Sequence, residues 1–191
     1  TLNFIWKLIN FIILLVLIFQ VSIPNIKGVL KDVTISTVAE KDNYIESDDA
    51  SSNNGGKDWL IFGDYIFGWN EAYLYFNFSD KPTDWIKAEI SIYMYSISET
   101  FNVTASLITD SWDELTITWL NKPAHREVIS TFTVAEGKIY KIDVTDYIAG
   151  RDNISICLNA SDYLQGGYVQ ATSKEGTYKK SYIAIWLFKS L

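Results

Sequence analysis

Apolar and polar residues alternate with a period of two along most of the chain after residue 30. The clearest runs are AYLYFNF at 72–78, EISIYMY at 89–95 and NISICLN at 153–159. Successive side chains of an extended chain point to opposite faces, so each run predicts a strand with an apolar face and a polar face. Further runs of this kind lie at 102–107, 138–144 and 181–188, and the last is apolar on both faces.

Clusters of Gly, Asn, Asp and Pro separate these runs, for example SDDASSNNGG at 47–56 and AGRDN at 149–153. Such clusters favour turns, and their spacing of about 10 to 15 residues is typical of a sandwich rather than of βαβ units. We therefore predict an all-β fold, a jelly-roll-type antiparallel β-sandwich, over residues 33–191.

The first part of the chain has a different pattern. Residues 1–25 form a hydrophobic N-terminal segment around the run FIILLVLIF, and residues 26–32 form a linker. Three interpretations remain open for residues 1–23: a cleaved export signal, a membrane anchor, or an assembly element that packs against other copies as a helix or a donated strand. All three place the sandwich outside the cell or at its surface, and membrane contact would involve this segment alone.

The charge and the reactive residues exclude several function classes. The net charge of the 191-residue chain is −7, which argues against nucleic acid because phosphate binding needs a cationic face. Cys157 is the only cysteine and His125 the only histidine, so no disulfide can form within the chain. A Cys/His zinc site would need up to four ligands from a chain that offers two. We predict no catalytic residues and a non-enzymatic protein.

Several motifs follow one another in a recognisable order. They are WLIFGDY at 59–65, DSWDELTITWLNKPA at 110–124, KIDVTDYIAG at 141–150 and YVQATSKE at 168–175. Together they resemble the DNRLRE-type domain, which is related to the disaggregatase-related repeat and to a carbohydrate-binding module family. The resemblance covers about residues 33–191. It implies a jelly-roll sandwich on extracellular or surface proteins, polysaccharide binding in some members, and no catalysis by the domain itself.

The same resemblance bears on the role of residues 110–124. Trp112 and Trp119 fall on recurring tryptophan positions of the family, which implies a structural role for both. We expect residues 116–119 to form a short strand that ends at a turn containing Pro123, because proline cannot continue a ladder.

Acidic residues suggest two kinds of site. Asp113 and Glu114 are adjacent and therefore point in different directions, so we expect them to accept hydrogen bonds from turn amides rather than to act as a catalytic pair. A second acidic cluster near the first strand could hold a structural calcium ion or could be a solvated loop. Its candidate ligands are Glu40, Asp42, Asp48 and Asp49.

Glycosylation and sugar binding have their own candidates. Four Asn-x-Ser/Thr sequons lie on polar strand faces and predict N-glycans, at Asn77, Asn102, Asn153 and Asn159. Exposed aromatic rings are the usual platform for a pyranose, and the candidates are Trp59, Trp69 and Trp85. Trp69 is favoured because FGWNE predicts a hairpin tip. An outward stripe of tyrosines is also expected, at Tyr73, Tyr75, Tyr93 and Tyr95. The alternative is that these aromatics pack beneath loops or against another subunit.

Two functions follow from these features. The first is a structural subunit of an extracellular filament or layer, in which copies of the chain join head to tail through the hydrophobic segment. The alternative is an anchored or secreted polysaccharide-binding module. The acidic net charge makes an anionic polymer a poor match for the alternative.

Overall fold

A computed structural model describes residues 31–65, 68–161, 167–177 and 179–189 of the chain. The predicted hydrophobic segment, residues 1–25, lies outside the described residues. The fold below concerns the compact unit Asp32–Phe188. Within the described residues, the structure contains no helix long and apolar enough to cross a membrane.

The described residues form eleven strands and one short 3-10 helix. The strands are β1 Lys31–Val38, β2 Lys41–Glu46, β3 Trp59–Tyr65, β4 Gly68–Asn77, β5 Trp85–Ile97, β6 Asn102–Ile108, β7 Val128–Thr133, β8 Lys138–Asp143, β9 Asn153–Ala160, β10 Tyr168–Thr172 and β11 Tyr182–Lys189, and the helix is η1 Thr145–Tyr147.

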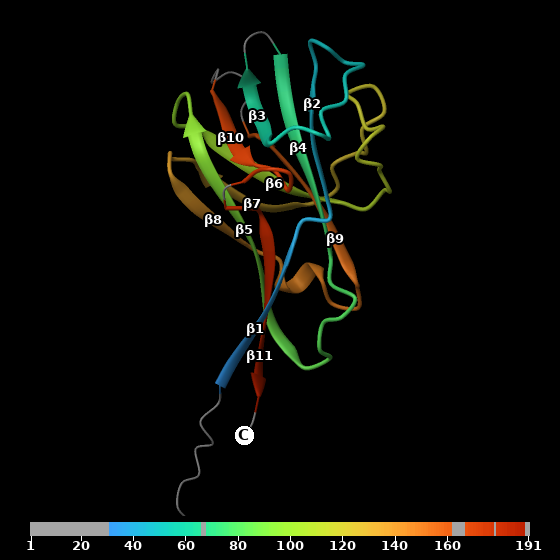
Figure 1. The fold of residues 1–191 in the computed structure, drawn as a ribbon, viewed down its shortest axis with the longest axis vertical. Coiled ribbons are helices and arrows are strands. Elements are labelled where there is room, and N and C mark those ends of the chain that lie inside the picture. The colour runs from blue at the N-terminus through green and yellow to red at the C-terminus, as the bar shows by residue number, and fades with distance from the viewer. Residues whose placement is uncertain (1–30, 66–67, 162–166, 178, 190–191) are drawn as a thin grey trace, which may run out of the picture. The chain divides into compact units, whose positions relative to one another are not determined.

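The strands form two layers that are connected along one edge (Figure 1). The first layer has the order β2-β4-β9-β6-β7, and the second contains β1, β11, β5 and β8. β10 and β3 connect the layers, because β10 pairs with β5 on one side and with β3 on the other, and β3 pairs with β4. These pairings are antiparallel, so the prediction of an all-β antiparallel sandwich is confirmed.

In β4, β5, β6 and β9, every second residue contributes to the core between the layers. β4 contributes Leu74 and Phe76, and β5 contributes Ile90, Ile92 and Met94, all of them fully buried. Burying a side chain of this size stabilises the fold by about 1.5–3 kcal/mol relative to leaving it exposed. The same alternation adds Val103, Ala105, Leu107, Ile154, Ile156 and Leu158 to the cluster. The inward faces predicted from the period of two are therefore confirmed.

A second, smaller apolar cluster lies on the outer face of the first layer. It contains Ile45, Tyr73, Ile108, Ile117 and Cys157, with Trp112 and Trp119 packed against it. Ile117 and both tryptophans come from residues 110–125, which we call the cover loop. The expectation that Tyr73 belongs to an exposed stripe is wrong, because the cover loop buries its side chain completely.

The cover loop is anchored to the sheet by a few directed contacts. The indole Nε1 of Trp112 donates a hydrogen bond to Ser155 Oγ at 2.7 Å. The ring of Trp112 also meets the ring of Tyr73 edge to face, with centroids 5.8 Å apart. Further along the loop, the Glu114 carbonyl accepts a hydrogen bond from Asn43 Nδ2 at 2.6 Å. These contacts join the loop to β2, β4 and β9.

The predicted strand at 116–119 does not form. The carbonyl of Ile117 accepts a hydrogen bond from Asn53 Nδ2 at 2.8 Å, and the backbone N–H of Thr118 donates to Asn121 Oδ1 at 2.6 Å. Asparagine side chains thus occupy backbone groups that a strand would need for its ladder, and turns replace the strand.

Candidate functional site

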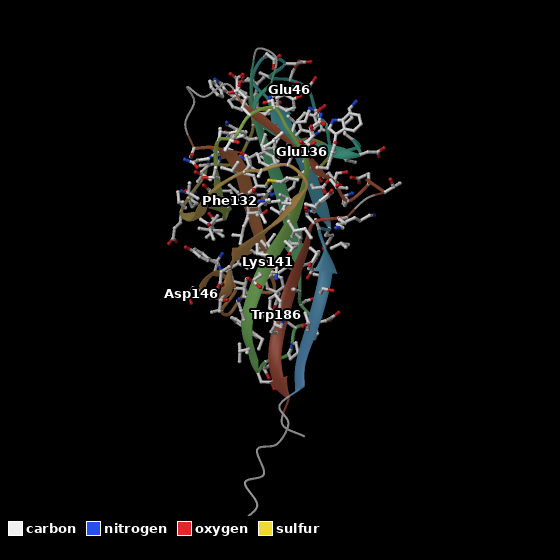
Figure 2. The ribbon with its side chains drawn as sticks, turned by 90° about the vertical axis from the view of Figure 1, so that its left-hand side faces the viewer. Glu46, Phe132, Glu136, Lys141, Asp146 and Trp186 are labelled. Atoms are coloured by element: carbon white, nitrogen blue, oxygen red, sulfur yellow. The ribbon has the colours of Figure 1, made fainter. Side chains whose placement is uncertain are left out.

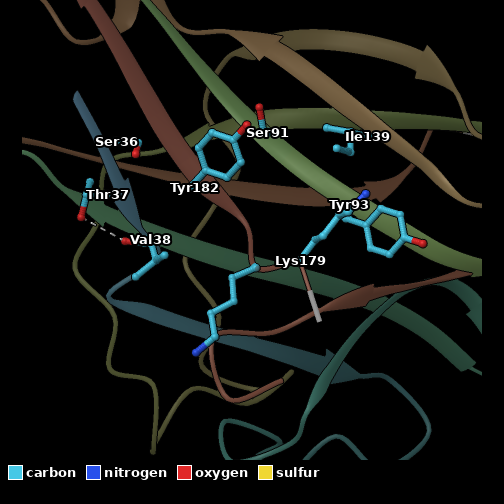
Figure 3. A pocket seen from close by; sticks show the side chains of 9 residues that line it. Ser36, Thr37, Val38, Ser91, Tyr93, Ile139, Lys179 and Tyr182 are labelled. Carbon is cyan, nitrogen blue, oxygen red and sulfur yellow. Dashed lines mark hydrogen bonds between the residues drawn. The ribbon is translucent and has the colours of Figure 1, made fainter. Parts of the chain in front are cut away.

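A groove of about 460 Å³ opens on the outer face of the second layer (Figure 3). This volume lies within the range of about 300–1,000 Å³ that small-molecule sites usually occupy. The groove is lined by residues 36–38 of β1, Ser91 and Tyr93 of β5, Ile139 of β8, Tyr182 of β11, and Lys179 and Lys180 just before β11.

The groove lies where the long strand β5 changes partners along one edge. Tyr182 of β11 pairs with Ser91, whereas Ala171 of β10 pairs with Met94 three residues later on β5. Tyr93 lies on β5 between these two pairings. The side of Tyr93 that faces β10 and β11 is therefore not filled by a continuous strand, and the sheet surface is hollowed there.

Two tyrosine rings share this face of the sheet, as Figure 3 shows. Because Tyr182 pairs with Ser91, Tyr93 is its diagonal neighbour, and such neighbours lie roughly 7–8 Å apart. Ile139 pairs with Tyr93 from the other edge of β5 and is 45% exposed. Both tyrosines are half-buried, so each ring is supported by packing and still offers surface to a ligand. The groove thus combines flat apolar surfaces with hydroxyl groups.

Lysine side chains border the groove. Lys179 and Lys180 line it directly, and the Lys179 ammonium lies 5.1 Å from the ring centroid of Tyr93. A cation over an aromatic ring is attracted to its negative face, which helps to hold both groups in place. The groove therefore carries positive charge beside its aromatic lining.

The same face continues along β11, β5 and β8, where Figure 2 labels Lys141 and Trp186. The Lys87 ammonium lies 5.7 Å from the ring centroid of Trp186. Lys87 and Lys141 both pair with Glu89, at 3.2 and 3.8 Å. Asp143, which pairs with Glu89, also lies on this face. With the two lysines of the groove, the described side chains named here comprise four lysines and two acids, although the whole chain is acidic.

A scan against protein families matches residues 33–186 to carbohydrate-binding module family 96. The match covers most of the chain. The chain belongs to carbohydrate-binding module family 96. Modules of such families bind carbohydrate, are generally non-catalytic, and are typically extracellular or attached to the cell surface. This bears out the carbohydrate-binding side of the resemblance, whereas the DNRLRE-type assignment stays a prediction. No curated protein matches the chain.

The three tryptophans predicted to bind sugar lie at separate places in this family 96 domain. Trp59 begins β3 and is 38% exposed, whereas Trp69 pairs with Asp64 beside the β3–β4 hairpin, five residues or roughly 17 Å further along β3. Trp85 begins β5 and packs partly against the main core. None of the three lines the groove. As sugar-binding residues they stay predictions, and they do not form one platform.

Of the tyrosines predicted to face outward, only Tyr93 lines the groove. Tyr75 lies on β4 in the other layer, with the Lys41 ammonium 5.1 Å from its ring centroid. The sequence pattern did not single out Tyr182. The sequence did hold one indication of its role. The last strand, which contains Tyr182, is apolar on both faces, so side chains on its outer face also need apolar contacts.

Of the acids predicted to bind calcium, Asp42 lies in a carboxylate cluster. Its carboxylate oxygen, together with one each from Glu114 and Glu175, forms a group whose members lie within 4.8 Å of one another. Lys174 donates its backbone N–H to Asp42 at 2.6 Å, and its ammonium lies 3.0 Å from Glu114 and also contacts Glu175. Lys174 thus balances part of the negative charge. Calcium binding stays a prediction.

The remaining predicted calcium ligands are not part of this group. Asp49 accepts hydrogen bonds from the hydroxyls of Ser51 and Ser52, at 3.4 and 2.5 Å. The group around Asp42 contains neither Glu40 nor Asp48. Asp42 therefore gathers with acids from the cover loop and from the segment after β10, rather than with its neighbours in sequence.

The clustered carboxylate makes stability depend on pH. Burial, followed by the charges of Glu175 and Glu114, raises the pKa of Asp42 to about 7. The folded protein therefore keeps a proton between about pH 4 and pH 7 that the unfolded chain has lost, so Asp42 lowers stability as pH rises through this window. In the presence of a chelator, Asp42→Asn should raise the free energy of unfolding by about 2–4 kcal/mol at pH 8 and have little effect at pH 4. Urea unfolding at pH 4, 6 and 8 measures this. A stabilisation that is equal at all three pH values would show that the Asp42 charge is not responsible.

The four sequons differ in exposure. Asn77, Asn102 and Asn153 are exposed at strand ends, and Asn77 pairs directly with Asn153 across β4 and β9. Asn159 is half-buried, and its side-chain oxygen is buried. Glycosylation of all four stays a prediction, and the exposed three offer a glycan direct access to solvent.

Proposed function

We propose that this domain binds a polysaccharide in the groove between β1, β5, β8 and β11, outside the cell. The observation that carries the proposal is the convergence of Tyr93 and Tyr182 on one open face of a family 96 module. A groove on the face of a β-sheet can accept a chain of sugars along its length, whereas a closed pocket accepts a chain end.

The chemistry of the lining fits a pyranose ligand. The apolar face of a sugar ring packs on an aromatic ring, while its hydroxyls form hydrogen bonds with polar groups around the ring. Tyr93 and Tyr182 supply the rings, and the hydroxyls of Ser36 and Thr37 lie on the β1 side of the groove. The exposed side chain of Ile139 extends the apolar floor.

The lysines favour sugars that carry carboxylates. The acidic net charge argued against an anionic polymer, but it averages over the whole surface. The charged residues that line the groove are Lys179 and Lys180. The local charge therefore removes the electrostatic objection to a uronate-containing polymer, and binding to such a polymer should weaken as salt increases.

Affinity electrophoresis tests the proposed function. The intact domain is run through native gels that contain neutral or uronate-containing polysaccharides, and at least one polymer should retard it. Trp69→Ala should be retarded equally, because Trp69 lies beside the β3–β4 hairpin and not in the groove. Loss of retardation in this variant would show that the binding site lies at the hairpin and not in the groove. The absence of retardation by every polymer of the panel would contradict the proposal.

The filament-subunit hypothesis stays a separate prediction. It depends on the hydrophobic residues 1–25, which lie outside the described residues, and neither the fold nor the family match bears on it. If the segment joins copies of the chain, deleting residues 1–25 leaves monomers.

A further inference from the structure

The chain's only histidine and only cysteine meet beneath the cover loop, beside a buried carboxylate. Glu71 Oε2 lies 3.2 Å from His125 Nε2 and 4.0 Å from Cys157 Sγ. These three donor atoms all lie within 4.8 Å of one another. We propose that Glu71, His125 and Cys157 bind a Zn²⁺ ion that fastens the cover loop to the sheet.

Three different parts of the fold bring these residues together. Glu71 is in β4, Cys157 is in the neighbouring strand β9, and both point to the outer face because Cys157 pairs with Tyr73, two residues after Glu71. His125 ends the cover loop, which folds back over this face. Cys157 lies 86 positions after Glu71 in the sequence, so the pattern of residues alone does not reveal the group.

The donor atoms are close to the separations that zinc requires. Zinc binds Cys at about 2.3 Å, His at about 2.0–2.1 Å and carboxylate oxygens at about 2.0–2.2 Å, so donors of a tetrahedral site lie roughly 3.3–3.6 Å apart. The Glu71–His125 and Glu71–Cys157 separations of 3.2 and 4.0 Å are near this range. The third separation, between His125 and Cys157, is at most 4.8 Å, so side-chain rotations that shorten it by up to about 1.2 Å would complete the triangle.

The donor set favours zinc over calcium and magnesium. Thiolate and imidazole suit zinc, whereas calcium and magnesium prefer oxygen ligands alone. Burial raises the pKa of the Cys157 thiol, so the metal-free protein holds it as the neutral thiol. On binding, Cys157 releases its proton to solvent and forms a bond from sulfur to zinc, and His125 binds through Nε2 with its remaining proton on Nδ1.

Neighbouring groups already orient the carboxylate. The Lys122 ammonium donates to Glu71 Oε1 at 2.8 Å, so a metal ion would bind Oε2, where it would replace the hydrogen bond that the Tyr73 hydroxyl donates. The Tyr73 hydroxyl lies 2.9 Å from Oε2 and 3.4 Å from His125 Nε2, close to the position of a fourth ligand. The side chains of His125 and Lys122 are 29% and 26% exposed, which gives an ion a path from solvent.

The buried Glu71 carboxylate has enough hydrogen-bond donors without His125 and Cys157. Lys122 and Tyr73 satisfy both oxygens of the carboxylate. The contact from Cys157 is long at 4.0 Å, and a thiol is a weak donor. A metal site needs three donor atoms gathered around one point, and those of Glu71, His125 and Cys157 all lie within 4.8 Å of one another.

Metal titration of the full chain tests the proposal. Protein freed of metal by a chelator is titrated with Zn²⁺ and, separately, with Co²⁺ as a spectroscopic probe. We expect one ion per chain, a higher melting temperature with Zn²⁺, and a Co²⁺ spectrum with a thiolate charge-transfer band and the strong visible bands of a four-coordinate centre. His125→Gln should weaken Zn²⁺ binding roughly 100-fold or more, since even groups behind the ligands change affinity by about 10–100-fold.

Two further variants sharpen the result. Cys157→Ser should remove the charge-transfer band, and Asp113→Asn, an exposed acid of the same loop, should change neither affinity nor spectrum. Cys157 is buried, so Cys157→Ser can fail to fold. The His125 side chain is partly exposed, so His125→Gln should fold and still tests the site. The proposal is overturned if Zn²⁺ shows no saturable binding at micromolar concentration, if Co²⁺ binds without a thiolate band, or if His125→Gln leaves affinity unchanged. The groove lies on the other layer, so these results are independent of polysaccharide binding.

Discussion

Replacing Tyr93 and Tyr182 together with alanine should abolish measurable polysaccharide binding while the domain stays folded. Both rings are half-buried and line the groove, so a sugar that packs on them loses most of its apolar contact when they are truncated. Central aromatic contacts in binding sites commonly cost more than about 1.4 kcal/mol when truncated, which is a factor of ten in affinity. Each single substitution should therefore weaken binding roughly tenfold or more, as measured by isothermal titration.

Tyr75→Ala is the matched control for these variants. Tyr75 is also a half-buried strand tyrosine with a lysine near its ring, but it lies on the other layer. Its truncation should leave affinity within a factor of two or so. Equal loss of affinity in Tyr75→Ala and in the groove variants would mean that general destabilisation, and not contact with the ligand, explains the effect.

Truncation of Trp112 should destabilise the fold more than any exposed substitution in the cover loop. Trp112→Ala removes the hydrogen bond to Ser155 and the edge-to-face contact with Tyr73. Large core aromatics cost about 3–5 kcal/mol when replaced by alanine, and Trp112 is partly exposed, so we expect about 3 kcal/mol. For a domain of this size, that lowers the melting temperature by roughly 6–12 °C.

Leu120→Ala provides the comparison within the same loop. Leu120 is 76% exposed, and its truncation should change the free energy of unfolding by less than about 0.5 kcal/mol. Urea unfolding of both variants measures the difference. If Trp112→Ala were as stable as Leu120→Ala, the cover loop would not be part of the folded core.

The fold was predictable because most of its strands alternate apolar and polar residues. A strand with one face in the core must place an apolar side chain at every second position, so Leu74 and Phe76 or Ile90 and Ile92 identify the inward face without knowledge of their partners. The outward face is harder to predict. Tyr73 points outward, but a loop some forty residues later covers it, and nothing within its own strand indicates that cover.

The groove depends on pairings that the sequence does not contain. Tyr93 belongs to β5 and Tyr182 to β11, and they become neighbours because β11 pairs with the first half of β5 and β10 with the second. Trp69 looked more promising because a tryptophan beside a turn is easy to recognise locally. Sequence patterns favour such local features over sites that form between distant strands.

In the cover loop, one expectation from the sequence agrees with the structure and another does not. The family resemblance implied a structural role for Trp112 and Trp119, and both pack on the smaller cluster. The strand expected at 116–119 was wrong because Asn53 and Asn121 bind its backbone, and one of these comes from a distant turn. In the same way, His125 and Cys157 looked isolated until β9 and the loop brought them to Glu71.

Nuclear magnetic resonance mapping of the bound sugar tests the central claim most directly. The isotope-labelled domain is titrated with an oligosaccharide cut from the polymer that retards it in native gels. We predict that the largest amide shift changes fall on residues 36–38, 91–93, 139 and 179–182. Changes centred instead on Trp59, Trp69 or Trp85, or on the cover loop, would contradict the assignment of the groove as the binding site.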